Sequence, residues 1–454
     1  MLRVAVVGSG PSGVYTAQSL VQLDPGVLVD VLDRLPCPYG LVRYGVAPDH
    51  EKIKSLQNNL RTVLEHGRVR FLGGVLVGPG GLPATRLREL YDAVVYCVGA
   101  ATDRRLGIPG EDLPGSWSAT EFVSWYSAHP DSTADGFVLG ARAAVVIGVG
   151  NVAVDVTRIL ARGAAELSRT DMPQAALTAL AASGVTDVHM VGRRGPSQAR
   201  FTTKELRELG GLPDTEVTVD PGELALDPAC LDLAALPGAQ RRNVEALRTW
   251  AALPPRGAPR RIHLRFFLRP VELLADAGRV GAVRFERTAP DGQGSVVGTG
   301  QFEEIEAQLV LRSVGYRGVP LDGLPFDAEH GTVPHRAGRV VRDGRTVPGE
   351  YVAGWIKRGP TGVIGTNRPD AKETVTSLLE DASALVRQEA LVGHEASEDP
   401  LTALRAAGIE PVEWAGWEAI ERAEAELGAS LGRGGVVKLP DWEALLAAIR
   451  GAHT

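Results

Sequence analysis

Two apolar runs in this chain each end in a glycine-rich loop that leads into a helical segment. Residues 2–13 read LRVAVVGSGPSG and residues 144–153 read AVVIGVGNVA, so the two loops begin at Gly8 and Gly148, 140 residues apart. A strand, a G-x-G-x-x-G/A turn and a helix form the unit that binds a pyrophosphate at the helix N-terminus. Two such units predict that one chain binds two dinucleotides.

The first loop has an acidic partner in register. Gly8 permits the tight turn, Gly10 lets a pyrophosphate approach the backbone, and Gly13 lets the helix pack on the strand. Asp33 lies 20 residues after Gly13, at the end of a second apolar run at 27–33. A carboxylate there accepts hydrogen bonds from ribose hydroxyls, which suits FAD or NAD and repels a 2′-phosphate. The alternative is an ordinary strand–turn–helix with a solvated aspartate. The residues expected to contact this dinucleotide are Gly8, Gly10, Pro11, Ser12, Gly13 and Asp33.

The second loop is followed by basic residues instead. It offers Gly148 and Gly150, and Ala153 takes the third small position, which the fingerprint allows. The strand expected at 187–192 runs into Arg193 and Arg194. Two guanidinium groups there would hold a 2′-phosphate through bidentate, charge-assisted hydrogen bonds. The second dinucleotide is therefore expected to be NADPH, with NADH bound more weakly. The alternative is a solvated surface pair.

The order of strands and helices indicates a mostly parallel, doubly wound sheet in each half of the chain. Strands are expected at 3–7, 27–33, 92–99, 187–192 and near 262–268, with a helix over about 13–23. The run at 307–316 has the same pattern as 92–99, and the chain then returns to the first domain through 349–355. We predict an α/β fold of two Rossmann-like domains, with the NADP domain inserted into the FAD domain. The boundaries are 1–106 and 320–387 for the FAD domain, 107–319 for the NADP domain, and 388–454 for a C-terminal helical extension packed on the FAD domain.

Composition and charge exclude several classes of protein. The chain has 44% hydrophobic and 23% charged residues and a net charge of −7, which argues against general nucleic-acid binding. No apolar run of about 18 residues is present, so no membrane span is expected. A first strand that begins at Leu2 leaves no length for a signal peptide, and we expect a cytoplasmic monomer.

The cysteines and histidines predict neither dithiol chemistry nor a metal site. Cys37, Cys97 and Cys230 form no CxxC or CxxxxC pair. This spacing disfavours a disulfide scaffold, an iron–sulfur cluster and a redox-active dithiol. The nine histidines contain no HxH or HExxH motif, so we expect no metal.

One segment is more specific than the general dinucleotide-binding pattern. Residues 38–54 read PYGLVRYGVAPDHEKIK. With four further segments in the same order, it resembles the adrenodoxin-reductase-like ferredoxin–NADP⁺ reductases, including their actinobacterial members. Those segments are 148–155 (GVGNVAVD), 192–198 (GRRGPSQ), 201–208 (FTTKELRE) and 354–367 (GWIKRGPTGVIGTN). The resemblance covers residues 2 to about 380 and implies a glutathione-reductase-like arrangement of the two domains.

The resemblance implies roles for the residues at matching positions. Asp33 stands where many members have a glutamate for the FAD ribose. His50 and Glu208 match a pair that orients the nicotinamide and routes protons, because hydride transfer itself needs no nucleophile. Taken alone, His50 would be structural and Glu208 part of a solvated helix face. Further FAD contacts implied are Leu41, Val75, Val77, Trp355, Gly362, Val363 and Ile364. Further NADP contacts implied are Asn151, Val152, Arg193, Arg194 and Glu205, and Gly362 would also touch the nicotinamide.

The resemblance also implies a one-electron acceptor of the ferredoxin type. Ferredoxins are usually acidic, so a basic docking face is required despite the net charge of −7. The alternative is that the available basic residues form ordinary surface ion pairs. The candidates for the docking face are Arg241, Arg242, Arg248, Arg256, Arg260, Arg261 and Arg265, with Lys357 and Arg358 nearer the flavin.

Other functions are weighed against this prediction. A disulfide reductase needs a cysteine pair beside the flavin. A flavin monooxygenase or a diaphorase-like reductase would use NADPH with a different acceptor, for which the 359–365 run could line a pocket. A glutamate-synthase-type small subunit would carry N-terminal cysteine clusters, and a non-catalytic redox-sensing module would have degenerate loops. Both loops are intact, so we predict an enzyme, a ferredoxin–NADP⁺ reductase that uses FAD and NADPH.

Overall fold

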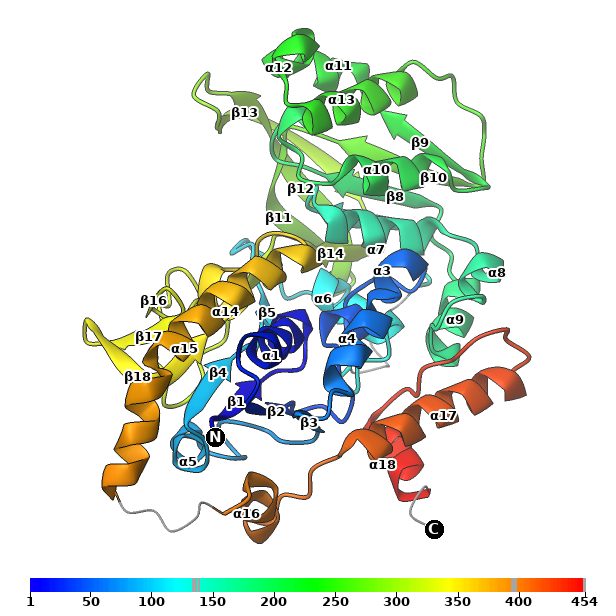
Figure 1. Ribbon diagram of the computed structural model, residues 1–454. Helices are drawn as coiled ribbons and strands as arrows, with labels where there is room; N and C mark the ends of the chain where they lie inside the picture. Colours follow the sequence, from blue (N-terminus) through cyan, green and yellow to red (C-terminus); the bar gives the residue numbers. More distant parts are fainter. Residues whose placement is uncertain (133–136, 138, 393–397, 452–454) are drawn as a thin grey trace. The chain divides into compact units, whose positions relative to one another are not determined.

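The structure is a computed structural model that describes residues 1–132, 137, 139–392 and 398–451 (Figure 1). The chain divides into two compact units. The first unit contains residues 1–46, 50–102 and 315–454, and the second contains residues 47–49 and 103–314. The chain therefore enters the second unit twice. The earlier entry is the short segment 47–49, although these residues are predicted from the sequence to lie in the first domain.

A seven-stranded sheet organises the first unit, with the strand order β16-β17-β18-β4-β1-β2-β3. The strands from β18 to β3 run parallel, and Val4 of β1 lies opposite both Val29 and Ala93. β16 and β17 extend the sheet as an antiparallel ribbon. The bounds are β1 Arg3–Val7, β2 Leu28–Leu32, β3 Val69–Leu72, β4 Ala93–Tyr96, β16 His335–Arg336, β17 Arg339–Arg342 and β18 Arg345–Val352.

Helix α1 (Pro11–Leu23) follows the first glycine loop. It begins two residues earlier than the expected position 13, because the fixed φ and missing N–H of Pro11 suit the first helical turn. Val14, Ala17 and Leu20 recur at helical spacing and are fully buried. Helix α15 (Asn367–Val392) packs beside α1 (Figure 1). The other helices before residue 367 in this unit are α2 Leu41–Tyr44, α3 Glu51–Lys54, α4 Leu56–Leu64, α5 Ala84–Leu90 and α14 Trp355–Arg358, with a 3-10 turn at Ile364–Thr366.

Three helices near the C-terminus belong to the first unit as well. Trp417, Ile420 and Leu445 are almost completely buried and share one hydrophobic core with strand residues such as Phe71. Trp414 meets the Phe71 ring edge-on, with the ring centroids 6.3 Å apart. The end of the chain is therefore part of this unit's core. The three helices are α16 Pro400–Ala406, α17 Trp414–Ser430 and α18 Trp442–Gly451.

A six-stranded sheet organises the second unit, with the order β6-β14-β7-β8-β10-β9. All of its pairings are parallel. Every residue of β7 is buried, as expected of a central parallel strand covered on both faces. The strands are β6 Ser116–Ser118, β7 Ala143–Ile147, β8 Asp187–Val191, β9 Thr215–Val219, β10 Arg260–Arg265 and β14 Leu309–Arg312. The helices are α6 Ala119–Tyr126, α7 Asn151–Ala161, α8 Ala164–Leu167, α9 Gln174–Ala181, α10 Thr203–Gly210, α11 Pro221–Ala225, α12 Pro228–Leu231 and α13 Gly238–Ala251, with 3-10 turns at Pro196–Gln198 and Leu233–Ala235.

A three-stranded antiparallel sheet in the second unit is absent from the sequence-based expectation. Its strands are β11 Leu268–Asp276, β12 Arg279–Pro290 and β13 Val296–Glu306, in that spatial order. Ala277 and Gly278 form the two-residue turn between β11 and β12, with φ values of 47° and 79°. Positive φ at both positions is the geometry that favours tight hairpins, but alanine gives little sequence signal for it. Two short strands, β5 Thr102–Asp103 and β15 Tyr316–Arg317, lie at the junctions between the units.

The two doubly wound parallel sheets confirm the predicted α/β class with two Rossmann-like domains. The observed β1, β8 and β14 fall within the runs expected to be strands. In the part of the chain that the structure describes, no helix is both long enough and apolar enough to cross a membrane.

The β7–α7 turn makes a test of this packing possible. Gly148 has a φ of +137°, and a Cβ added there would lie 2.2 Å from the Ser313 carbonyl oxygen of the adjacent strand end. We expect Gly148→Ala to lower the free energy of unfolding by about 2 kcal/mol or more, since strained backbone positions alone cost about 1–3 kcal/mol. Urea unfolding followed by circular dichroism measures the change. Gly163→Ala, whose added Cβ meets nothing within 4 Å, is the control and should change stability little.

Candidate functional site

The first glycine loop is closed by backbone contacts that leave no room for side chains. Gly8 has a φ of +110°, and a Cβ added there would lie 2.5 Å from the Cys97 carbonyl oxygen. A Cβ added at Gly13 would lie 1.8 Å from the Gly8 carbonyl oxygen. Gly10 differs, because an added Cβ there meets only the Gly40 Cα, at 3.9 Å. Two of the three glycines therefore build the turn, and the third leaves the backbone open to a ligand.

Asp33 is fixed at the edge of this loop. Its Oδ2 accepts hydrogen bonds from the Ser9 backbone N at 2.8 Å and from the Ser9 Oγ at 2.6 Å. Its Oδ1 accepts one from the Leu35 backbone N at 2.9 Å. The residue follows β2 directly and is half-buried. The structure thus places the expected ribose carboxylate beside the phosphate loop and holds its orientation.

The chain approaches the same loop again at a tight turn. Gly40 has a φ of +49°, and a Cβ added there would lie 2.8 Å from the Gly10 Cα. Tyr39 is also in the left-handed region, at φ 82°, and its backbone N donates to the Ser9 carbonyl oxygen at 3.1 Å. Leu41 follows at the start of α2 and is 47% exposed. Leu41 is therefore available to a ligand bound over the loop.

The backbone of the segment that contains Val75 and Val77 lies beside that of Asp33. The Val75 N donates to the Asp33 carbonyl oxygen at 2.8 Å. Both valine side chains are buried in the core under β1 and β4, so they offer a ligand their backbone more readily than their side chains.

The segment that begins at Gly354 meets the N-terminus of α1. Gly354 has a φ of +79°, and a Cβ added there would lie 2.3 Å from the Ser12 Oγ. Trp355 follows and stacks on Tyr316, with the ring centroids 5.7 Å apart and an interplanar angle of 20°. The Gly354 N donates to the Asp370 Oδ2 at 2.6 Å, which ties this segment to α15. Trp355 therefore directly follows a residue that packs closely against the Ser12 side chain in the first turn of α1.

The next turn carries the remaining residues expected at the flavin. Gly362 has a φ of +84°, and Val363 N donates to the Thr366 Oγ1 at 3.1 Å. The Val363 side chain is 64% exposed and Ile364 is half-buried. An apolar surface of this kind suits a planar ring system better than water.

The second glycine loop repeats the design in the second unit. Gly150 precedes α7, and an added Cβ there meets nothing within 4 Å, so space is open above the helix N-terminus. Asn151 Oδ1 accepts a hydrogen bond from the Thr202 N at 2.8 Å, which ties the loop to the start of α10. Ala153 is fully buried and Val152 partly so. The open N-terminus of α7 is suited to an anion.

Arg193 and Arg194 follow β8, where the sequence predicts them. Their carbonyl oxygens are held by the Thr288 Oγ1 at 2.8 Å and by the Phe267 N at 3.2 Å. The Arg193 side chain is exposed, and Arg194 is half-buried. The Arg194 Nε is buried without a hydrogen-bond partner among the described residues. A buried donor without a partner is costly, so this guanidinium is suited to an anionic ligand.

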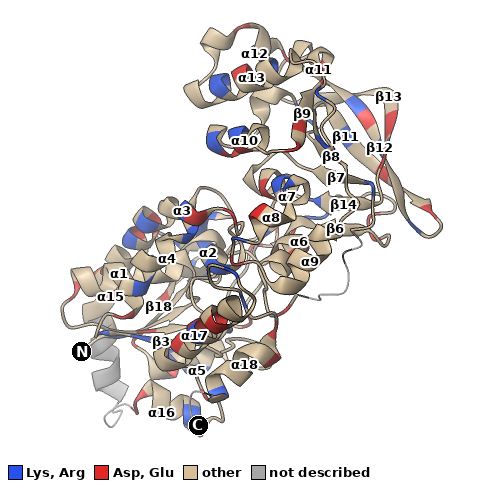
Figure 2. Ribbon diagram, turned by 90° about the vertical axis from the view of Figure 1, so that its right-hand side faces the viewer, with Lys and Arg blue, Asp and Glu red and all other residues tan. Residues whose placement is uncertain are grey.

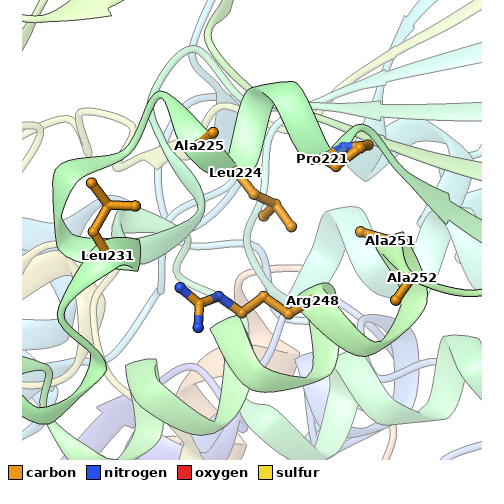
Figure 3. A pocket seen from close by; sticks show the side chains of 7 residues that line it. All are labelled: Pro221, Leu224, Ala225, Leu231, Arg248, Ala251 and Ala252. Atoms are coloured by element: carbon orange, nitrogen blue, oxygen red, sulfur yellow. The ribbon is translucent and has the colours of Figure 1, made fainter.

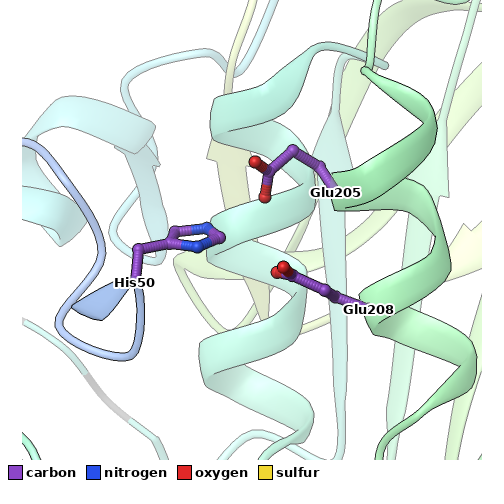
Figure 4. Close-up of side chains that lie close together, drawn as sticks. All are labelled: His50, Glu205 and Glu208. Atoms are coloured by element: carbon purple, nitrogen blue, oxygen red, sulfur yellow. The ribbon is translucent and has the colours of Figure 1, made fainter. Parts of the chain in front are cut away.

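Glu205 and Glu208 lie one turn apart on α10, as Figure 4 shows. Both belong to an ionic network around a buried arginine. At its centre is Arg158 of α7, whose side chain is 1% exposed. Its Nη1 lies 3.4 Å from Glu208 and 3.8 Å from Glu205, and its Nη2 lies 2.8 Å from Asp155. Burial alone would lower the pKa of Arg158, but the surrounding carboxylates raise it above its ordinary value.

Asp49 completes this network from the segment 47–49. Its carboxylate accepts two hydrogen bonds from Arg158, at 2.7 and 2.9 Å. Asp49 directly precedes His50 in the chain, so the ion pair restrains the backbone next to His50. Nothing in the sequence pairs Asp49 with Arg158, which lie 109 positions apart, although Asp49 stands in the specific 38–54 segment.

Comparisons with known proteins match this organisation. A family model described as pyridine nucleotide-disulphide oxidoreductase matches residues 2–208. The NADPH-ferredoxin reductase FprA of Mycobacterium tuberculosis is 49% identical over 389 residues, 83% of each chain. The mitochondrial NADPH:adrenodoxin oxidoreductase of Arabidopsis thaliana is 41% identical over 464 residues, 98% of this chain and 95% of that one. A solved structure of M. tuberculosis FprA in complex with NADPH matches with a TM-score of 0.91 and 43% identity, and the match covers 100% of both chains.

The chain belongs to the adrenodoxin-reductase-like ferredoxin–NADP⁺ reductases. It is therefore an oxidoreductase, and the resemblance stated from the five sequence segments is confirmed.

Two residues expected on the docking face of the reductase are tied up in ion pairs. Lys357 is buried, with its Nζ 3.0 Å from Asp370 Oδ1 and 2.7 Å from Glu373 Oε2. A buried, paired ammonium cannot meet a partner surface, so the assignment of Lys357 is wrong. Arg265 is mostly buried between Glu223 and Glu303, with both carboxylates at 2.8 Å. Its charge is already balanced within the unit.

The other arginines of the predicted docking face differ in whether their side chains already have partners within the protein. Arg358 donates to the Asn367 Oδ1 at 2.7 Å, and Arg261 lies 2.8 Å from Asp187. Arg256 and Arg260 donate to backbone carbonyl oxygens of their own unit. Arg241 and Arg242 are exposed residues of α13, whose ribbon has blue segments for basic residues in Figure 2. These two are the strongest remaining candidates.

A pocket in the second unit lies between α11, α12 and α13 (Figure 3). Its lining is apolar except for Arg248, which donates to the Cys230 carbonyl oxygen. No residue expected at either dinucleotide lines it. The lining residues are Pro221, Leu224, Ala225, Leu231, Arg248, Ala251 and Ala252.

The three cysteines of the reductase are buried and free. Burial raises the pKa of Cys37 and Cys97 to about 11 and that of Cys230 to about 12. These thiols therefore stay protonated near neutral pH and are poor nucleophiles. This state does not suit the redox-active dithiol of a disulfide reductase.

The network around Arg158 can be tested by removing its central charge. We expect Arg158→Met to lower the free energy of unfolding by about 3–5 kcal/mol, because it leaves several carboxylates buried without their cation. Urea unfolding followed by tryptophan fluorescence measures this. Arg86→Met breaks an exposed pair with Glu89 and serves as the control. Equal small effects of the two variants would contradict the role given to Arg158.

Proposed function

We propose that the reductase transfers electrons between NADPH and a ferredoxin-type carrier through FAD. The single observation that carries this proposal is the presence of two complete glycine loops, each with its own ribose signal. The first loop has the Asp33 carboxylate beside it, and the second leads to Arg193 and Arg194 after the next strand. We assign FAD to the first unit and NADPH to the second. We therefore propose residues 1–46, 50–102 and 315–454 as the FAD domain and residues 47–49 and 103–314 as the NADP domain.

The first unit has a site whose form suits FAD. Gly10 leaves the backbone open, and Asp33 offers carboxylate oxygens for ribose hydroxyls. We assign Leu41, Trp355 and the 362–364 turn to the isoalloxazine side, and Val75 and Val77 to the adenine side. When bound, FAD supplies the chemistry that accepts two electrons from NADPH and gives them up singly to an acceptor. The residues of this unit contribute binding, orientation and exclusion of water.

The second unit has a site whose form suits NADPH. The open space at Gly150 lies at the N-terminus of α7, where backbone N–H groups and the helix dipole favour a pyrophosphate. Arg193 and the unpartnered Nε of Arg194 offer donors to a 2′-phosphate. We assign Asn151, Val152 and Glu205 to the same cofactor. An NADH ribose carries no 2′-phosphate, so the arginines would add little to NADH binding.

We assign His50 and Glu208 to the orientation of the nicotinamide and the passage of protons. His50 is buried and directly follows Asp49, which Arg158 holds through two hydrogen bonds. Glu208 lies 3.4 Å from the Nη1 of the same arginine. Arg158 therefore interacts with Glu208 directly and with the residue next to His50.

An acidic ferredoxin is the acceptor that fits a one-electron step. We propose Arg241 and Arg242 as part of the docking face, because they are exposed. The other arginines of this set act there only if their present partners are released.

The assignment of NADPH is tested by the double variant Arg193→Ala/Arg194→Ala. It should raise the KM for NADPH strongly and that for NADH little, since each lost charge-assisted contact costs about 1.5–3 kcal/mol. Steady-state kinetics with a small artificial acceptor measures both constants. Arg104→Ala/Arg105→Ala removes another adjacent arginine pair of the same unit and should leave both KM values near those of the wild type. Equal effects of the first double variant on the two coenzymes would refute the assignment.

A further inference from the structure

The C-terminal helices carry no residue assigned above to a cofactor, yet they reach the turn over the first glycine loop. The contact is a buried cluster of three charged residues: Arg43 from α2, Glu424 from α17 and Lys438 from the segment after α17. Arg43, Glu424 and Lys438 are 4%, 3% and 2% exposed, respectively. Charged residues are rarely so buried unless paired, and each such group is costly to desolvate.

The geometry of this cluster is closely specified. Arg43 donates to both carboxylate oxygens of Glu424, at 2.6 Å from Nη2 and 3.2 Å from Nη1. The Lys438 Nζ donates to the Arg43 carbonyl oxygen at 2.5 Å. The Leu439 N donates to the Glu424 Oε1 at 3.0 Å, so the carboxylate also holds its own end of the chain. Both the side chain and the backbone of Arg43 are thus hydrogen-bonded to residues of the C-terminal segment.

Aromatic contacts reinforce the same attachment. The Arg43 guanidinium lies 4.9 Å from the centroid of the Trp417 ring. Trp417 meets the Tyr39 ring edge-on, with the centroids 5.8 Å apart. The Lys438 ammonium lies 5.6 Å from the centroid of the Tyr44 ring. Helix α17 and the segment after it therefore contact both ends of the 39–44 turn.

This turn needs such support. Tyr39 has a φ of 82°, a conformation that non-glycine residues rarely adopt, and Gly40 follows at φ 49° against Gly10. Strained positions of this kind persist only where the surroundings hold them. Helix α2 has four residues, which is too short to be stable without tertiary contacts. The contacts that hold Tyr39 and Arg43 in place include those from the C-terminal helices.

We propose that the C-terminal extension is a clamp that holds the 39–44 turn against the first glycine loop, with Glu424 as a positioning residue for FAD. The inference rests on the proposed binding of FAD in the first unit. Glu424 acts through Arg43, on the turn that carries Leu41 and meets Gly10. Loosening this pair should open the loop without altering any residue assigned to contact the cofactor.

The experiment compares FAD release from purified holoenzymes. Glu424→Gln keeps the side-chain volume but leaves Arg43 without its carboxylate partner. Glu421→Gln is the matched control on the same helix, because it breaks the 2.7 Å pair with Arg61 of α4, outside the turn. Leu87→Ala, in a separate core of the same unit, provides a variant destabilised without any contact with the turn. The readouts are the rate at which FAD passes a protein-retaining filter after dilution, and the thermal midpoint by circular dichroism.

The clamp predicts that Glu424→Gln accelerates FAD release at least about tenfold, which corresponds to about 1.4 kcal/mol. Glu421→Gln should release FAD nearly as slowly as the wild type, and Leu87→Ala should lower the thermal midpoint without comparable release. Unchanged release from Glu424→Gln would overturn the inference. The inference would also be overturned if, in Glu424→Gln and Leu87→Ala, the FAD release rate rose by the same amount for the same drop in thermal midpoint. That result would indicate an effect of lowered stability alone.

A second variant covers the case in which Glu424→Gln does not fold. Lys438→Met keeps the Arg43–Glu424 pair and removes only the ammonium that donates to the Arg43 carbonyl oxygen. The clamp predicts faster FAD release from it too, and unchanged release would count against the clamp. A wild-type protein that holds no FAD would refute the proposed function itself, which separates that failure from failure of the clamp.

Discussion

Close backbone packing at the two glycine loops is the constraint on which the rest of the structure depends. At Gly13 and Gly148, an added Cβ would fall within 1.8 and 2.2 Å of a carbonyl oxygen. The strand end, the turn and the following helix can therefore meet only through glycine. That packing leaves the N-terminus of each helix accessible, and the neighbouring strand then presents either Asp33 or the two arginines after β8. Under the proposed function, these few side chains on two similar scaffolds distinguish the two dinucleotides.

Two buried ionic clusters fix the positions of segments that have few stabilising contacts of their own. Arg158 gathers carboxylates from three separate stretches of the second unit, and Arg43 joins the 39–44 turn to the C-terminal helices. Each cluster replaces lost hydration with several specific hydrogen bonds, so its geometry is closely defined. Both lie next to residues that the proposed function needs: His50 follows Asp49, and Leu41 lies two positions before Arg43.

The sequence predicted the elements whose residues are consecutive. The strands β1 and β8, the loops after β1 and β7, and the positions of Asp33 and Arg193 could all be read locally. The β11–β13 sheet was missed because its first turn uses alanine, where glycine or asparagine would have signalled a hairpin. The Asp49–Arg158 and Arg43–Glu424 pairs were missed because they join residues 109 and 381 positions apart. Lys357 was misassigned because a basic residue in a turn-rich segment looks exposed until its carboxylate partners on α15 are seen.

Anaerobic stopped-flow absorbance of the purified protein tests the central claim most directly. The protein is mixed with NADPH or with NADH, and an oxidised ferredoxin is then added. The account predicts a flavin band that NADPH bleaches much faster than NADH does, and that ferredoxin restores. A flavin band bleached equally fast by both coenzymes, or no flavin band at all, would contradict it.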